Sequence, residues 1–299
     1  MRLKDRCDCE RSPAALWAPS LCGGRTNTVS RRTHIAAVLL ALGLVPALPV
    51  ASDAQETAQP TATAQEPAKA APVSEIRPPQ PGHRFPNGET WVYQVEWRIF
   101  DAGVATLRIE PAGREQRVTA SANSTGVVSM LFAVRDRFEA FLDPRTFCSR
   151  QISKHTEEGY RRLESSLRFD AARRKSVLEE KNLKTGSTKR LENDTPGCIT
   201  DVVSGIYYLR SLPLEPGETY TFPVNDGGKT VNVSALVESR EEIQTPAGTF
   251  QTLRVGPAPA ERGQAWIWYS DDADRIPVQM RARLVWGTLT FRLERIEHR

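Results

Sequence analysis

From residue 89 to the C-terminus the sequence alternates between apolar and polar residues with a period of two, and this pattern constrains the fold most. One face of the first such stretch is formed by apolar side chains, namely Trp91, Tyr93, Val95, Trp97 and Ile99. Because successive side chains of a strand point to opposite faces, the pattern predicts a half-buried strand with an aromatic inner face.

About thirteen stretches of this kind follow one another at spacings of about ten residues. The turn signals between them include Asp101–Gly103, Pro111–Gly113, Asn225–Gly228 and Thr245–Gly248. Such spacing is typical of an antiparallel meander. So many strands in one domain curl into a barrel or split into packed sheets, which limits exposed edges. We therefore predict a mainly β fold, a curled antiparallel sheet that is barrel-like, with one or two short helices.

One segment breaks the pattern, because its apolar residues between Asp201 and Leu212 fall at helical spacing. Thr200 is placed to cap the start of this helix, and Pro213 ends it. A second, short helical segment is expected at Val127–Phe132.

The N-terminal region has the organisation of a secretion signal. Arg31 and Arg32 precede an apolar run at Ile35–Val50, and small residues follow at Ala51–Ala54. The run is shorter than the roughly 20 residues of a membrane span, and no lipid-anchor cysteine follows it. We interpret residues 1–54 as a signal peptide region, in which residues 1–28 could precede the true start codon. The alternative is a retained membrane anchor.

Residues 55–84 are rich in Ala, Pro, Gln and Thr, which predicts a disordered tether or a processing remnant. Residues 85–299 are then a single β-rich domain of a periplasmic or secreted protein. After residue 54 the chain carries 33 basic and 32 acidic residues, so it lacks the charge of a nucleic-acid binder. We expect no nucleic-acid partner and no transmembrane segment in the mature protein.

Two cysteines remain after residue 54, Cys148 and Cys198. In an oxidising compartment such a pair is a candidate disulfide, which would close a loop of about 50 residues and stabilise the fold by about 4 kcal/mol. Two buried thiols or half of a metal site are the alternatives.

Common catalytic motifs are missing from the sequence, including glycine-rich phosphate loops, Gly-x-Ser-x-Gly and His-Glu-x-x-His. His155 and Glu157 share one face of a predicted strand and could bind zinc or share a proton. Only three histidines follow residue 54, so we favour a solvated strand face, and we assign no catalytic residue, metal or cofactor.

The helix and the turn that contains Asp271 are the best candidates for a polar ligand-binding site. A carboxylate at Asp201 suits the positive end of the helix dipole, which is a structural role. Arg210 could pair with the last carbonyls of the helix or with Asp271 or Asp272. The candidate ligand-binding residues are Asp201, Tyr208, Arg210, Asp271 and Asp272.

The aromatic residues allow two interpretations. They could fill the core, or they could line a hydrophobic cavity, as in barrels that hold one ligand. The residues concerned are Trp91, Tyr93, Trp97, Phe100, Trp266, Trp268 and Trp286.

Four further segments form a pattern of their own, namely Thr200–Gly217, Glu241–Phe250, Trp268–Asp272 and Arg275–Val278. Together they resemble a family of exported bacterial proteins known as domain of unknown function 3108. The resemblance covers residues 85–299 and implies an exported, β-rich, barrel-like fold. It transfers no activity or catalytic residue. The cysteine pair looks like a feature of a subgroup, which implies a disulfide.

Export, neutral charge and missing catalytic motifs favour non-catalytic binding of an envelope component, which is a lipid, a glycan or a protein. One alternative is an envelope hydrolase that uses Asp201, Asp271 or His155. The other is an assembly factor that pairs with another chain through an exposed, uncharged sheet edge.

Overall fold

The computed structural model describes residues 74–225, 227–258, 265–284 and 287–298. The predicted signal region and the first part of the predicted tether, up to residue 73, lie outside the described residues. No helix in the described part of the chain is long and apolar enough to cross a membrane.

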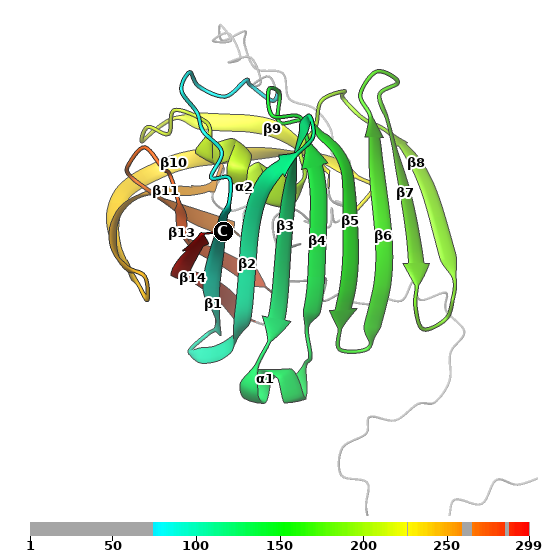
Figure 1. The fold of residues 1–299 in the computed structure, drawn as a ribbon, viewed down its shortest axis with the longest axis horizontal. Helices are drawn as coiled ribbons and strands as arrows, with labels where there is room; N and C mark the ends of the chain where they lie inside the picture. Colours follow the sequence, from blue (N-terminus) through cyan, green and yellow to red (C-terminus); the bar gives the residue numbers. More distant parts are fainter. Residues whose placement is uncertain (1–73, 226, 259–264, 285–286, 299) are drawn as a thin grey trace, which may run out of the picture. The chain divides into compact units, whose positions relative to one another are not determined.

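The described residues form fourteen strands and two helices, and all strands belong to one curled, unclosed antiparallel sheet (Figure 1). This confirms the predicted fold class. The elements are β1 (Glu89–Trp97), β2 (Phe100–Ala112), β3 (Glu115–Ser124), α1 (Gly126–Leu131), β4 (Arg135–Leu142), β5 (Ser149–Glu158), β6 (Arg161–Asp170), β7 (Lys175–Asn182), β8 (Thr188–Asp194), α2 (Val202–Arg210), β9 (Thr219–Asn225), β10 (Thr230–Thr245), β11 (Gly248–Pro257), β12 (Ala265–Ser270), β13 (Pro277–Leu284) and β14 (Gly287–His298).

Strands that follow one another in the chain are neighbours in the sheet, except β8 and β9, which lie at its two opposite edges. The order is β8-β7-β6-β5-β4-β3-β2-β1-β14-β13-β12-β11-β10-β9, so the first and last strands pair in its middle. Their register runs from Glu89 opposite His298 to Trp97 opposite Leu289. The edges of the sheet are β8 and β9, and the two halves meet along β1 and β14.

Helix α2 connects these two edges in sequence and is buried along its whole length. The ring of Tyr207 stacks on Trp91 of β1 with centroids 5.3 Å apart. Tyr208 meets Phe222 of β9 edge-on, and Tyr269 of β12 donates a hydrogen bond to the carbonyl of Ile206. The helix therefore fills the space inside the curled sheet and joins strands from both halves.

The ends of α2 differ from the expectation. Its N-cap is Asp201, not Thr200, because the Asp201 carboxylate accepts hydrogen bonds from the amides of Val203 and Ser204. Thr200 instead forms an isolated parallel bridge with Val224 of β9. The helix ends at Arg210, before the expected Leu212.

The first hairpin also turns earlier than expected, at Arg98 and Ile99 instead of Asp101–Gly103. Arg98 adopts a φ of 58°, and the Ile99 side chain is 87% exposed instead of facing the core. Gly103 lies within β2, where an added Cβ would be 2.1 Å from the carbonyl oxygen of Asn123. That glycine therefore permits close strand approach and does not mark the turn.

Residues 74–84 were expected to belong to the tether, yet they lie against the domain. The amide of Glu75 donates to the carbonyl of Thr221 on β9, and the amide of Gln80 donates to Ser211. Ile76 packs against the hydrophobic core. The packed part of the chain thus begins well before Phe85, and it covers part of the β9 edge.

The aromatic residues named above divide into three groups. Trp91, Tyr93, Trp266 and Trp268 are buried in the core, while Phe100 is 57% exposed in the first hairpin. Trp268 lies under the guanidinium groups of Arg254 and Arg281, whose centres are 5.7 and 5.2 Å from the ring. Trp97 is half-buried, and Trp266 is covered by Arg283. Trp286 lies outside the described residues.

Candidate functional site

Both carboxylate oxygens of Asp201 accept hydrogen bonds from within the protein. One oxygen caps α2 through the amides of Val203 and Ser204, at 3.0 and 2.8 Å. The other oxygen accepts a hydrogen bond from the hydroxyl of Ser149 on β5, at 2.7 Å. The side chain is fully buried, so these contacts hold the helix against the strand.

Arg210 joins the end of α2 to the turn after β12, as expected, but through backbone carbonyls. Its Nε donates to the carbonyl of Asp274 and a terminal nitrogen donates to the carbonyl of Arg84, both at 2.7 Å. The expected pair with Asp271 or Asp272 is therefore wrong. Burial lowers the pKa of Arg210.

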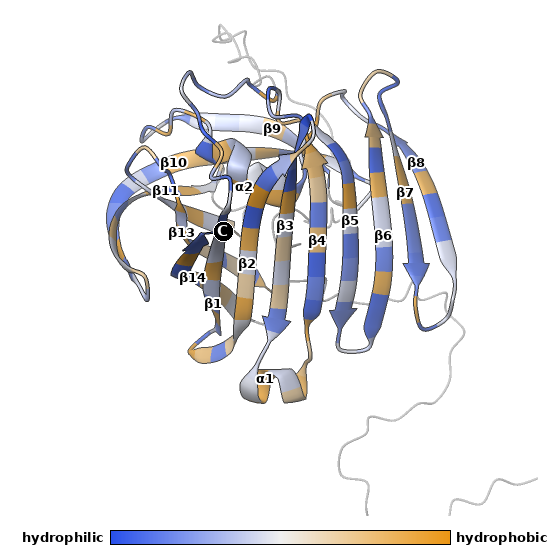
Figure 2. Cartoon of the chain, viewed as in Figure 1, coloured by the Kyte–Doolittle hydropathy of each residue, from blue (hydrophilic) through white to orange (hydrophobic). Residues whose placement is uncertain are grey.

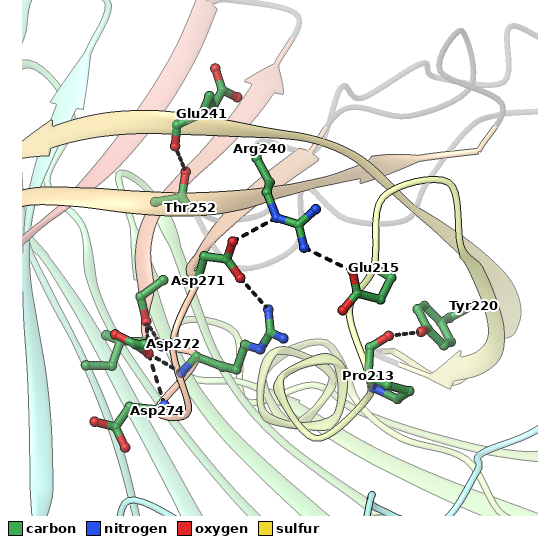
Figure 3. A network of polar contacts seen from close by, with 12 residues as sticks. Pro213, Glu215, Tyr220, Arg240, Glu241, Thr252, Asp271, Asp272 and Asp274 are labelled. Atoms are coloured by element: carbon green, nitrogen blue, oxygen red, sulfur yellow. Dashed lines mark hydrogen bonds and ion pairs between the residues drawn. The ribbon is translucent and has the colours of Figure 1, made fainter.

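The two aspartates have other partners (Figure 3). Asp271 bridges Arg240 at 2.8 Å and Arg275 at 3.5 Å. Asp272 accepts hydrogen bonds from the hydroxyl of Ser270 and from the amides of Asp274 and Arg275, which shapes the turn. The positive φ of Arg275, 47°, belongs to this tight turn.

Tyr208, the remaining predicted site residue, has its hydroxyl within 3.0 Å of the amide of Arg77, from which it accepts a hydrogen bond. Its ring lies between Phe147 and Phe222. Each of the five residues predicted for the ligand site thus makes a polar contact within the fold.

An open groove of about 1010 Å³ lies elsewhere, on strands β3 to β8. Two rows of side chains cross these strands on the face opposite the core, because each member of a row pairs with the next across the sheet. One row is Thr119, Glu139, Ser153, Ser166, Glu179 and Arg190. The other row is Ser121, Arg137, His155, Glu164, Lys181 and Thr188.

The chemistry of the groove is polar and balanced in charge. Hydroxyl groups alternate with acidic and basic side chains, so the groove offers many hydrogen-bond donors and acceptors without a strong field of one sign. The sequence contained this face as the polar half of the period-two pattern. Only the strand register, which the sequence does not display, shows that the residues line up.

His155 is the one groove residue that the sequence singled out. Its Nε2 is 3.4 Å from a carboxylate oxygen of Glu157, and its Nδ1 is 3.6 Å from one of Glu164. The predicted shared face of His155 and Glu157 is therefore observed. A hydrogen bond from Arg162, followed by that from His155, lowers the pKa of Glu157. Asp201 and Asp271 are absent from the groove lining.

A buried carboxyl pair, which sequence reasoning missed, lies at the end of β4 and β5. Asp136 and Glu158 are both buried, and Asp136 accepts a hydrogen bond from the amide of Glu157. Burial, with the neighbouring charge of Asp136, raises the pKa of Glu158 to about 8, although Arg161 is 3.4 Å away. The two residues are far apart in sequence and look like ordinary strand residues, so no local signal identified them.

Cys148 and Cys198 form a disulfide, which excludes the two alternatives kept open by the sequence. Ser149 donates its amide to the carbonyl of Ile199, so the bond lies next to the Ser149–Asp201 contact. Within the described ranges, no three His, Cys, Asp or Glu side chains gather in a metal-binding arrangement.

The fold and the groove together define a barrel-like, single-sheet β protein with a helix in its interior and a polar groove on the outside. The chain belongs to the family of proteins of unknown function DUF3108, whose family model matches residues 92–294. A search of curated proteins finds no match to the chain.

Three solved structures match the chain at low sequence identity. A β-barrel-like protein of the DUF1849 domain of unknown function from Brucella abortus is 8% identical, with a TM-score of 0.50 over 76% of this chain and 100% of that chain. An exported protein with a YmcC-like fold from Bacteroides fragilis is 10% identical, with a TM-score of 0.31 over 75% and 100%. A lipoprotein from Parabacteroides distasonis is 12% identical, with a TM-score of 0.32 over 76% and 100%.

Proposed function

We propose that this protein is a non-catalytic binding protein of the cell envelope, located outside the cytoplasm, and that its ligand is a glycan held in the groove on β3 to β8. The single observation that carries the proposal is the groove itself. Its rows of hydroxyl, carboxylate and basic side chains match a neutral ligand rich in hydroxyl groups. The disulfide and the signal-like N-terminus support the location.

A lipid inside the sheet is less compatible with the packing. α2 and the aromatic rings of Trp91 and Tyr207 occupy the interior. A second pocket, beside α2, has a volume of only about 50 Å³, enough for one or two water molecules. A lipid chain needs far more space, so lipid binding inside the sheet would require the displacement of α2.

The other two hypotheses receive less support. A sheet-edge assembly factor needs an exposed, uncharged edge. The β8 edge carries Lys189, Arg190, Glu192 and Asp194, which oppose strand addition. The β9 edge is uncharged, but residues 74–84 cover part of it. A hydrolase was expected to use Asp201, Asp271 or His155, and of these three residues only His155 lines the groove. It would act together with Glu157 or Glu164. This enzyme remains the second candidate function because of that histidine.

The test is native mass spectrometry of the protein purified from a bacterial periplasm. We expect a co-purifying oligosaccharide of defined mass. Ser166→Tyr would fill the middle of the groove and should remove the adduct, while Thr249→Tyr, an exposed substitution on β11, should keep it. A clean apo mass or a bound lipid would contradict the proposal. Cleavage of the saccharide that is lost in His155→Ala would support the hydrolase instead.

A further inference from the structure

Exposed apolar side chains gather at one end of the strands, where neighbouring strands are connected. Among the described residues, nine large hydrophobic side chains are exposed, and seven of these lie in or beside neighbouring connections at that end. We call them the apolar rim, which consists of Ile99, Phe100, Val127, Met130, Leu131, Tyr160 and Leu183. Their exposed fractions are 87, 57, 71, 84, 77, 91 and 37%.

The topology explains why these residues lie at the same end of the strands. In a meander every second connection lies at the same end of the strands, so the β1–β2, β3–β4, β5–β6 and β7–β8 connections are neighbours. Strands are about 4.8 Å apart, so these four tips are spaced by about 10 Å over a rim of about 30 Å. The first hairpin and α1 are at the lower edge in Figure 1, and Figure 2 shows hydrophobic residues there.

Helix α1 contributes most to the rim without being needed for the core. Val128 packs against the core, while Val127, Met130 and Leu131 point away from it. The helix has no buried residue and no side-chain cap. Nothing in the described part of the chain covers these three large side chains, which indicates that they contact a surface beyond the described residues.

Basic residues outnumber acidic residues around the rim, and three of the basic residues have carboxyl partners there, since Arg135 and Arg162 contact Glu157 and Arg161 contacts Glu158. Basic residues at these turns and strand ends are Arg98, Arg135, Arg161, Arg162, Lys181 and Lys184, and acidic residues are Asp101, Asp136, Glu157 and Glu158. Asp136 and Glu158 are buried, and the raised pKa of Glu158 keeps its carboxyl neutral near pH 7. The Lys184 ammonium lies 5.2 Å from the ring centre of Tyr160, so charged and aromatic groups are side by side.

We propose that the apolar rim docks this protein onto the surface of a membrane that contains anionic phospholipids. Separate apolar tips enter a fluid headgroup layer independently, whereas a protein partner would need one continuous complementary surface. Basic side chains between the tips bind the lipid phosphates. Aromatic residues such as Phe100 and Tyr160 are typical of this interface. The inference concerns a different surface from the glycan groove and does not depend on it.

The experiment is co-sedimentation of the full chain with vesicles of phosphatidylcholine and phosphatidylglycerol at low and high salt. The rim variant is Met130→Ser with Leu131→Ser. The matched control is Leu191→Ser with Val231→Ser, which removes two exposed apolar side chains from β8 and β10, outside the rim. All three proteins share residues 1–73, so differences between them report on the described domain.

We expect the wild type and the control to bind equally, and the rim variant to bind at least tenfold more weakly. Binding should weaken in high salt and with phosphatidylcholine alone. Thermal melting checks that each variant is folded. Equal binding of the rim variant and the control would overturn the proposal, since binding would then come from another part of the chain. So would a wild type that ignores vesicles but self-associates through the rim, because this would make the rim a protein interface.

Discussion

Tyr269 donates its hydroxyl hydrogen to the backbone carbonyl of Ile206 at 2.8 Å, which links strand β12 to a helix 63 residues earlier in the chain. Both residues are buried, and burial raises the pKa of Tyr269, so the hydroxyl stays protonated. The contact ties the second half of the sheet to the helix that fills its interior.

Tyr269→Phe should lower the free energy of unfolding by about 1 kcal/mol, because one buried hydrogen bond is lost without a change in shape. Urea unfolding followed by circular dichroism measures the effect. Tyr160→Phe is the control, since that side chain is 91% exposed and should leave stability unchanged. An equal effect of the two substitutions would argue against the link.

Asp201→Ala should lower the free energy of unfolding by about 2 kcal/mol, because two helix amides and the Ser149 hydroxyl lose their acceptor. Asp201→Asn keeps an oxygen for the cap and should cost less. Chemical denaturation of both variants gives the comparison. Unchanged stability together with lost ligand binding would instead make Asp201 a ligand residue, as the sequence suggested.

Glu158→Gln should change how stability depends on pH. The folded pKa of Glu158, about 8, lies above its ordinary value of 4.5. The folded state therefore binds the proton more tightly, and this stabilisation, complete below about pH 4.5, is lost as the pH rises through 8. Between pH 6.5 and 8 the wild type should lose about 1 to 2 kcal/mol relative to Glu158→Gln.

Urea unfolding at several pH values measures this difference. Glu164→Gln is the control, because that carboxylate has a side chain that is 58% exposed on the outer face. Parallel pH profiles of the wild type and Glu158→Gln would show that the carboxyl pair is not protonated as described.

His83→Phe should change how the stability of the protein depends on pH in the acidic range. Burial beside Phe85 and Phe147, and then the charge of Arg210, lower the pKa of His83 to about 4. The unfolded state binds the proton more tightly, so the wild type loses stability as the pH falls from about 6.5 towards 4. The loss should stay below about 1 kcal/mol per pH unit, because His83 is partly exposed.

Thermal melting at pH 7 and pH 5 tests this prediction. The wild type should lose melting temperature between these pH values, and His83→Phe should lose less. His298→Gln, a change at an exposed residue near the chain end, should behave like the wild type. An unaltered profile in His83→Phe would contradict the half-buried, neutral state of this histidine.

Cys148→Ser with Cys198→Ser should lower the free energy of unfolding by about 4 kcal/mol, because the loop between residues 50 positions apart is no longer closed in the unfolded chain. Reduction of the wild type with dithiothreitol should reproduce the effect. A variant as stable as the oxidised protein would mean that the bond adds nothing to the fold.

The sequence predicted most of the secondary structure because the alternation of side chains depends on local geometry alone. It also identified the helix near Asp201, whose cap residue is local in sequence. It did not predict that this helix is buried on all sides, since an amphipathic spacing normally means one exposed face. The predicted pairing of Arg210 with Asp271 was wrong, because the partners of both side chains depend on which of several nearby acceptors and donors the tertiary fold brings closest.

The groove was visible in the sequence only as part of an ordinary strand pattern, and the rim only as scattered apolar residues of separate turns and of the short helix. Ser153 and Ser166 are polar residues of separate strands until the register makes them neighbours. Ile99 counted as an inner residue of the first strand because it continued the alternation, and the early turn at Arg98 reversed that assignment.

The pairing of β1 with β14 also sets a condition on synthesis. The centre of the sheet needs residues 89–97 and 287–298 at the same time, so both segments must have left the ribosome before the two halves can join. Loss of the last strand would leave β1 and β13 as two new unpaired edges and would expose the protein to aggregation and proteolysis.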